Sequence, residues 1–114
     1  MIHIRKSKNQ IELNLRAVSM GNDLCIILTG GEAHLGAVTS GSGDIQLKTV
    51  SMGNHKEHYV TEKIGKILRG KFSESFVICC GIHFDNITKN EIQDIISLSG
   101  DMTEDLLKEL GKWK

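Results

Sequence analysis

The sequence predicts an α+β protein in which an antiparallel sheet, made from an N-terminal strand meander and one later strand, carries two to three packed helices. Apolar and polar residues alternate in several stretches before Ser51, which is typical of half-buried strands. After Ser51 apolar residues recur at helical spacing, except in the short run 76–80, which has the length of a buried strand. The 114 residues fit one domain, 1–114.

The first half of the chain is expected to contain four strands. Residues 11–18 alternate apolar and polar side chains, and residues 24–28 form a continuous apolar run. The Gly-Asn-Asp turn at 21–23 accepts the tight conformations of a hairpin, so these two strands should pair antiparallel. Two further strands are expected over 35–38 and 45–51.

A helix is predicted from Asn54 to about Leu68, with Asn54 as the N-cap and Glu57 three residues later as a capping-box partner. His55 and His58 lie in the same first turn. The free N–H groups and partial positive charge of a helix N-terminus favour anions, so this turn is a candidate anion site. The capping role explains Glu57 without any function.

A second helix is predicted to begin at Thr88, because Thr88 and Glu91 form a T-x-x-E capping box. Residues 99–101, Ser-Gly-Asp, should break this helix. Leucines beyond the break predict a last short helix: Leu106, Leu107 and Leu110.

The charge and composition of the chain exclude several classes of protein. Lysine and arginine total 14, aspartate and glutamate total 14, and the formal net charge is zero, so no nucleic-acid footprint is expected. No apolar run has the length of a membrane span, and the N-terminus lacks the apolar core of a signal peptide, so we expect a cytoplasmic protein. The three cysteines lie in apolar runs and are expected to be small buried side chains.

The most unusual stretch is 81–88, where polar residues crowd the junction between the strand at 76–80 and the following helix. His83 and Asp85 are two residues apart, so their side chains share one face in an extended chain. Asp85 and Asn86 are also ordinary turn residues, and His83 with Asp85 could be a satisfied structural pair. Because rigidly held strand ends often carry binding chemistry, a functional site is the competing interpretation.

A glycine-rich segment, 30–38, contains His34 between its glycines. The N–H groups of such a loop can hold an anion, although a corner between two strands is the simpler interpretation. The segment is neither a P-loop nor a dinucleotide-binding turn, because no Gly-Lys-Ser/Thr follows and no G-x-G-x-x-G opens a helix.

Four of the five histidines lie in these three polar segments, accompanied by Glu57 and Asp85. If the segments converge, one possibility is a metal site, although no compact motif such as HExxH is present. A second is a phosphate or polar-ring ligand held by histidines, glycine N–H groups and a helix N-terminus. A third is a Cys–His nucleophile, for which the cysteines look too buried.

Three motifs in order resemble those of a known family. They are Gly30-Gly31-x-x-His34-Leu35-Gly36-Ala37-Val38, then His55-Lys56-Glu57, then Gly81-Ile82-His83-Phe84-Asp85-Asn86-x-Thr88-x-x-Glu91-Ile92. The chain resembles the LpdD-like prenylated-flavin chaperones, small proteins associated with gallate decarboxylase. The likeness spans most of the chain, and the G-I-H-F-D-N-x-T segment is its most specific part.

The resemblance implies a fold similar to that of eukaryotic proteasome assembly chaperones, and a homodimer. It also implies a non-catalytic protein that binds reduced prenylated FMN and helps to load it into a UbiD-like decarboxylase. Carried over by motif position, the residues that the resemblance assigns to cofactor binding are His34, Gly36, His55, Glu57, His83, Asp85 and Asn86. Aromatic residues make up only 4% of the chain, so the ligand contacts are expected to be mostly polar or to lie across a dimer interface.

Two other classes of function stay open beside this one. The first is a small metal-dependent enzyme that uses His34, His55, His83 and Asp85. The second is a pure protein-interaction module in which the polar segments are structural.

Overall fold

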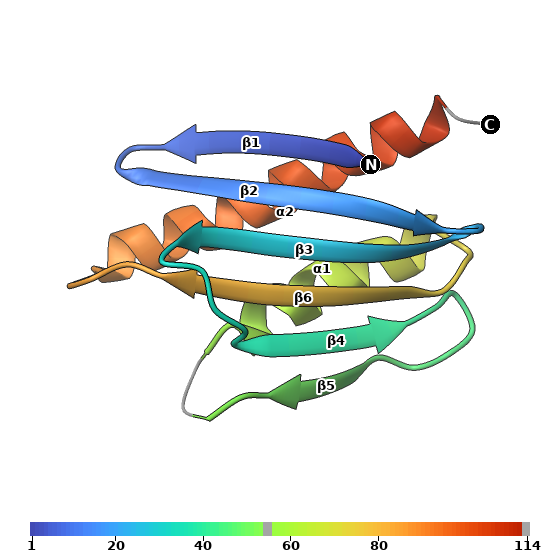
Figure 1. Ribbon diagram of the computed structural model, residues 1–114, viewed down its shortest axis with the longest axis horizontal. Coiled ribbons are helices and arrows are strands. Elements are labelled where there is room, and N and C mark those ends of the chain that lie inside the picture. Colours follow the sequence, from blue (N-terminus) through green and yellow to red (C-terminus); the bar gives the residue numbers. More distant parts are fainter. Residues whose placement is uncertain (54–55, 113–114) are drawn as a thin grey trace.

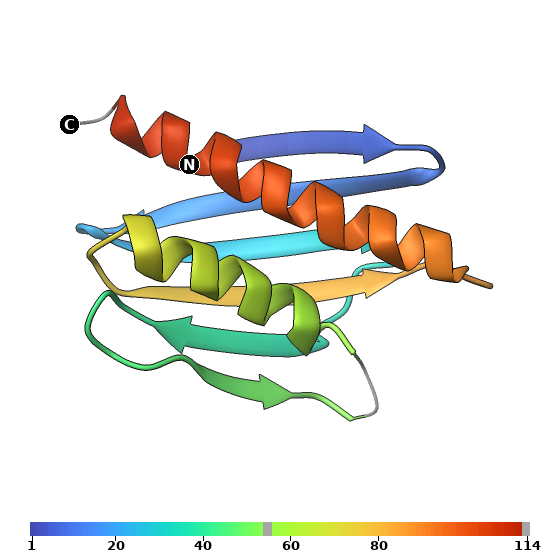
Figure 2. The ribbon, with the colours of Figure 1, turned by 180° about the vertical axis from the view of Figure 1, so that it is seen from behind.

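The structure, a computed structural model, describes residues 1–53 and 56–112. In these residues the elements are β1 (Ile2–Lys8), β2 (Ile11–Met20), β3 (Asp23–Gly31), β4 (Ala37–Gly41), β5 (Lys48–Ser51), α1 (His58–Lys71), β6 (Phe76–His83) and α2 (Lys89–Gly111). The strands form one sheet, and both helices cover the same face of it (Figures 1 and 2). The α+β class predicted from the periodicity is therefore confirmed.

The sheet is mixed, which corrects the expectation of a purely antiparallel sheet. Its strand order is β1-β2-β3-β6-β4-β5, and β6 runs parallel to β3 while every other neighbouring pair is antiparallel. The reason is that β6 follows α1, which crosses the sheet face, so β6 returns between β3 and β4 in the direction of β3. The expected continuous meander is thus wrong after β3, because β4 pairs with β6 instead.

The strand pattern places one side of each strand in the core. In β2, alternate residues from Ile11 to Ala17 are buried, and the β3 partners of Leu13, Leu15 and Ala17 are buried as well: Gly30, Leu28 and Ile26. The strands expected over 35–38 and 45–51 are found as β4 and β5 with shifted bounds. The edge strand β1 was not predicted, because its apolar alternation is short. Of its seven residues only Ile2 and Ile4 are apolar, and both face the core.

Helix α1 begins at His58, so the prediction of a helix beginning at Asn54 is wrong; Asn54 and His55 themselves lie outside the described residues. Glu57 is the N-cap residue, and its side chain makes no capping hydrogen bond. The capping box predicted between Asn54 and Glu57 lies outside the described residues because it involves Asn54, and the described contact of the Glu57 carboxylate is with His34. The predicted apolar face is confirmed, since Val60 and Ile64 are buried against the sheet.

Helix α2 is one helix, and the predicted break at residues 99–101 is wrong. The capping box is confirmed: the Thr88 hydroxyl accepts a hydrogen bond from the Glu91 backbone N–H, and the Glu91 carboxylate accepts one from Thr88 N–H. A single glycine costs a helix only about 1 kcal/mol, which continuous burial of Leu98, Met102 and Leu106 offsets. Neither helix of the described part has the length and hydropathy to cross a membrane.

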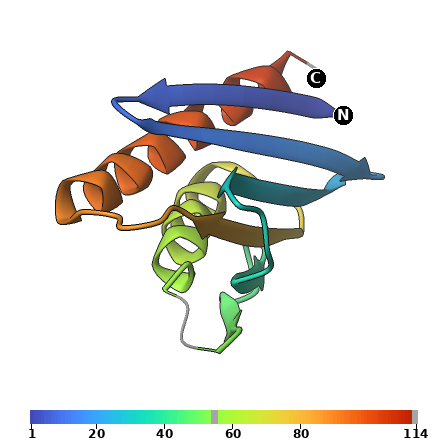
Figure 3. The ribbon, with the colours of Figure 1, turned by 60° about the vertical axis from the view of Figure 1, so that its left-hand side comes forward.

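The helices leave the second face of the sheet open, as the side view in Figure 3 shows. Helix α2 packs on β1 and β2, and α1 packs on β4 and β6. The expectation of three buried cysteines holds for Cys80, which points into the core. Cys25 and Cys79 are only half-buried because they lie on the open face, and all three are free thiols.

Candidate functional site

The glycine-rich segment and the 81–88 segment meet at one end of the sheet. Parallel pairing of β3 with β6 places Gly31 opposite His83, and the Glu32 N–H donates to the His83 carbonyl at 3.0 Å. Next along, the Gly36 N–H donates to the Cys80 carbonyl at 2.8 Å. The rings of His34 and His83 consequently lie edge to face, with centroids 6.2 Å apart.

Close approach of two backbones makes this junction possible. A Cβ on Gly81 would overlap the carbonyl oxygen of His34, so the loop that carries His34 lies directly on Gly81. Gly31 has a φ of 64°, a left-handed conformation that favours glycine, and it forms the corner after β3. The interpretation of 30–38 as a strand corner is therefore correct, and the same corner brings the two histidines together.

Glu57, from the N-terminus of α1, completes the cluster. Its Oε2 lies 2.7 Å from Nε2 of His34, and the two side chains are only 10% and 26% exposed. The contact has the distance of an ion pair, which it forms when the His34 imidazole is protonated. Residues far apart in the sequence thus converge, as the sequence analysis allowed but did not establish.

Gly36 contributes space to this pair. A Cβ on Gly36 would overlap the Glu57 carboxylate, so only glycine leaves room for that carboxylate beside His34. Gly36 therefore helps to position Glu57, and the ligand contact that the resemblance implies for Gly36 stays a prediction.

His83 and Asp85 form a second pair at the rim of the site. Nε2 of His83 lies 3.1 Å from Oδ1 of Asp85, and the side chains are 50% and 90% exposed. The predicted shared face of these two residues is confirmed. Asn86 adopts a left-handed backbone conformation with φ of 55°, which is a turn role that asparagine tolerates well.

Of the two histidines expected in the first turn of the helix, only His55 belongs to the predicted cofactor-binding set. His55 lies outside the described residues. His58 lies beside Tyr59, with ring centroids 4.1 Å apart, and lines neither of the hollows described below. Among the described residues no group of three or more His, Cys, Asp or Glu side chains is arranged to hold a metal ion, so the metal-enzyme alternative gains no support there.

The cysteines do not supply a nucleophile to this cluster. Burial raises the pKa of the Cys80 thiol strongly, and the nearby Glu57 carboxylate raises it further. Burial also raises the pKa of Cys79, with a smaller contribution from Cys25. Since the thiolate is the reactive form, the Cys–His alternative is disfavoured by the structure.

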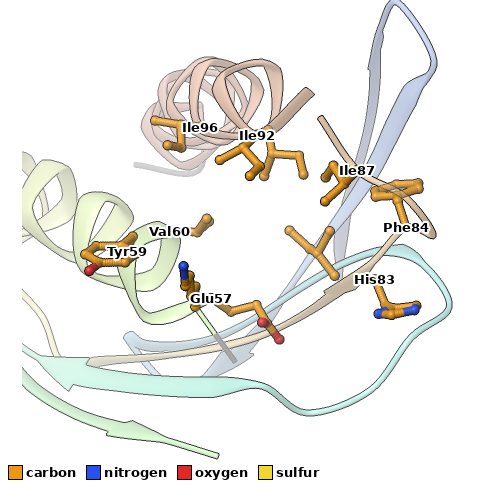
Figure 4. A pocket seen from close by; sticks show the side chains of 11 residues that line it. Glu57, Tyr59, Val60, His83, Phe84, Ile87, Ile92 and Ile96 are labelled. Atoms are coloured by element: carbon orange, nitrogen blue, oxygen red, sulfur yellow. The ribbon is translucent and has the colours of Figure 1, made fainter. Parts of the chain in front are cut away.

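An apolar hollow of about 510 Å³ adjoins the cluster on the helix side of the sheet (Figure 4). It lies between the start of α1, the end of β6 and the start of α2. Its lining residues are Lys56, Glu57, Tyr59, Val60, Ile82, His83, Phe84, Ile87, Ile92, Ile95 and Ile96. A smaller hollow of about 290 Å³, lined by Glu32, Ala33, His34 and His83, lies next to it and shares His83.

Sequence reasoning missed the apolar hollow. Ile82 has the spacing of a core residue of β6, and Ile92, Ile95 and Ile96 have the spacing of core residues of α2. A signal was available, because Phe84 and Ile87 stand in a polar junction where neither strand nor helix periodicity requires them.

The six-stranded mixed sheet with both helices on one face gives this chain a fold similar to that of a proteasome assembly chaperone. The chain superposes on a chain from the crystal structure of a chaperone complex for yeast 20S proteasome assembly, with a TM-score of 0.65, 95% of each chain covered and 11% identity. At that identity the likeness shows the fold alone.

The sequence relationship identifies the family. The profile of the prenylated flavin chaperone LpdD-like domain matches residues 7–111, and the chain belongs to this family. Protein LpdD of Lactiplantibacillus plantarum is 31% identical over 100 residues, which cover 82% of this chain and 71% of that protein. The resemblance noted in the sequence is thereby confirmed. Family membership supports a chaperone role and favours a non-catalytic protein.

Proposed function

We propose that this protein binds reduced prenylated FMN and delivers it to a UbiD-like decarboxylase, without catalysing decarboxylation itself. The observation that carries the proposal is the convergence of His34, Glu57 and His83 beside the apolar hollow. A volume of about 510 Å³ lies within the usual range of small-molecule sites, and an apolar lining with a few polar groups is their usual composition. The description of the matching family supports the choice of ligand.

The residues present fit a flavin better than the low aromatic content suggested. Phe84 and Tyr59 both line the hollow, so two rings are available for the flat ring system. His83 is half exposed at the rim and can donate to a phosphate or carbonyl oxygen of the ligand. When delivered, the prenylated flavin supplies the reactive group of the decarboxylase, while the residues of this chain bind, orient and release it.

An open site suits a carrier. Asp85 is 90% exposed and Tyr59 is 62% exposed, so a ligand here would keep one side in contact with solvent. A carrier must release its flavin to the decarboxylase. A site that encloses the flavin only partly binds it less tightly, so release requires less free energy.

We also propose that the protein is a homodimer that associates through the open face of the sheet. Residues in register across four strands form an apolar row on that face: Ile27, Cys79, Val38 and Val50. Ile27 and Val50 are 37% and 58% exposed, and no helix of the described part covers them. Burying this row against a second copy would remove it from water.

The size of the open face supports a second copy as its partner. The four strands that carry the row, at about 4.8 Å spacing and with a nine-residue β3 rising about 3.3 Å per residue, span at most roughly 570 Å². Each partner in a standard interface buries about 800 Å². A face-to-face pair of identical sheets would be isologous, which is the commonest dimer symmetry.

The ligand proposal is tested by anaerobic titration with reduced prenylated FMN. We expect saturable binding by the wild type and weaker binding by His83→Ala. His3→Ala is the matched control, because His3 is also exposed, also pairs with one side chain, Asn14, and lies on the edge strand β1. Unchanged binding by His83→Ala would contradict the site assignment, and no binding by the wild type would favour the protein-interaction module instead.

A further inference from the structure

We propose that the two adjoining hollows are subsites of one flavin site, and that the apolar one selects prenylated over unmodified flavin through Ile92 and Ile96. This inference rests on the proposed function and adds to it a specificity determinant and a ligand orientation. The starting observation is that His83 lines both hollows, so a single ligand can extend from one into the other across that side chain.

The apolar hollow is built from three separate elements. Ile92 and Ile96 come from α2, Val60 comes from α1, and Ile82 with Phe84 comes from the end of β6 and the loop after it (Figure 4). Branched side chains on facing elements form a three-sided apolar wall. Such a surface recognises the shape of a compact alkyl group, because dispersion and burial reward close contact on every side.

The polar groups stand at one side of this hollow. Glu57 and His83 lie where it meets the smaller hollow, and Lys56 is the other charged residue in the lining. The smaller hollow is lined by Glu32, Ala33, His34 and His83. Carboxylate oxygens can accept hydrogen bonds from the hydroxyls of the ribityl chain, and an imidazole N–H can donate to a phosphate oxygen, which the carboxylates themselves would repel.

The ligand, like the site, has an apolar part and a polar part. Prenylation adds a dimethylallyl-derived ring along the edge of the flavin that already carries the dimethylbenzene ring, so both apolar parts lie together. The ribityl phosphate leaves from another edge. We therefore orient the alkylated edge toward Ile92 and Ile96 and the ribityl chain toward His83 and His34.

Ile92 offers a clean way to test this orientation. It lines the hollow yet is 42% exposed, so its replacement by a small polar residue removes apolar wall without opening the core. Ile45 is the matched control, because it is 57% exposed and lies in the turn before β5, outside both hollows. Ile92→Ser and Ile45→Ser are the same chemical change in two places.

The experiment is an anaerobic titration of wild type, Ile92→Ser, Ile96→Ser and Ile45→Ser with reduced prenylated FMN and with reduced FMN. Each buried methylene corresponds to about fourfold in affinity, so we expect the wild type to prefer the prenylated ligand by roughly tenfold or more. The ratio of the two affinities should fall by about threefold to tenfold in Ile92→Ser and Ile96→Ser, and stay unchanged in Ile45→Ser. Thermal melts show whether each variant is folded.

The outcomes separate this inference from the proposed function. Equal binding of both flavins by the wild type, or an unchanged affinity ratio in folded Ile92→Ser, would overturn the inference and leave the binding of prenylated FMN intact. No binding of either flavin by the wild type would overturn both. A fall in the ratio with Ile45→Ser equal to that with Ile92→Ser would also overturn the inference, because the effect would not be local to the hollow.

Discussion

Gly36→Ala should uncouple the His34–Glu57 pair, because the new methyl group overlaps the Glu57 carboxylate. To restore ordinary van der Waals contact, the Oε2 atom must move by on the order of 2 Å. His34 Nε2 lies only 2.7 Å from Oε2, so a shift of that size breaks the ion pair. Gly36 is not among the glycines with positive φ, so alanine fits its backbone and the clash is the main cost.

The magnitude follows from two opposing terms. Loss of a largely buried charged pair costs about 1–3 kcal/mol. Replacement of glycine by alanine at a compatible position stabilises by about 0.4–1 kcal/mol through the unfolded chain. The net loss lies between about zero and 2.6 kcal/mol with a centre near 1 kcal/mol, and 1 kcal/mol corresponds to a fall in Tm of about 4–8 °C for a chain of this size.

A double-mutant cycle measured by thermal and urea unfolding tests this reasoning. In the Glu57→Ala background no carboxylate meets the methyl group, so Gly36→Ala should become neutral or slightly stabilising. Gly70→Ala is the matched control, because nothing lies within 4 Å of a Cβ built there and its backbone is helical, so it should stabilise by about 0.5–1 kcal/mol. An equal cost of Gly36→Ala with and without Glu57 would refute the assignment of the clash to the carboxylate.

Three further predictions concern the ligand, the assembly and the thiols. His83→Ala and His55→Ala should each weaken binding of reduced prenylated FMN about tenfold to a hundredfold in anaerobic titration, and a matching loss of thermal stability would assign the effect to folding instead. Ile27→Lys should convert the dimer to a monomer in light scattering, and a wild type that is already monomeric would contradict the interface. Cys80 should resist alkylation until the protein unfolds, and alkylation of Cys80 in the folded protein at pH 8 would contradict this prediction. Because the pKa of Cys80 is raised in the folded state, its contribution to stability is present below the unfolded pKa near 9 and is lost as the pH rises above it.

Several features of the site were accessible from the sequence because they depend on neighbours in the chain. The two-residue spacing of His83 and Asp85 places both side chains on one face of an extended strand, and the structure pairs them. The capping box of Thr88 and Glu91 likewise uses only local geometry.

The apolar hollow could not be derived in this way. Its walls come from α1, α2 and the end of β6, and the packing of those elements creates the space between them. For the same reason the contact of Glu57 with His34 could not be derived, since it joins positions 23 residues apart in the chain.

The sequence by itself determined strands β2 to β6 and the two helical regions, because side-chain periodicity is a local property of the backbone, but it did not determine β1 or the bounds of the helices. It also determined which three segments carry the polar residues. Only the tertiary structure decided that β6 enters between β3 and β4, that α2 continues through Gly100, and that His34 meets Glu57. These features depend on long-range burial and on steric room at Gly36 and Gly81, which no local pattern encodes.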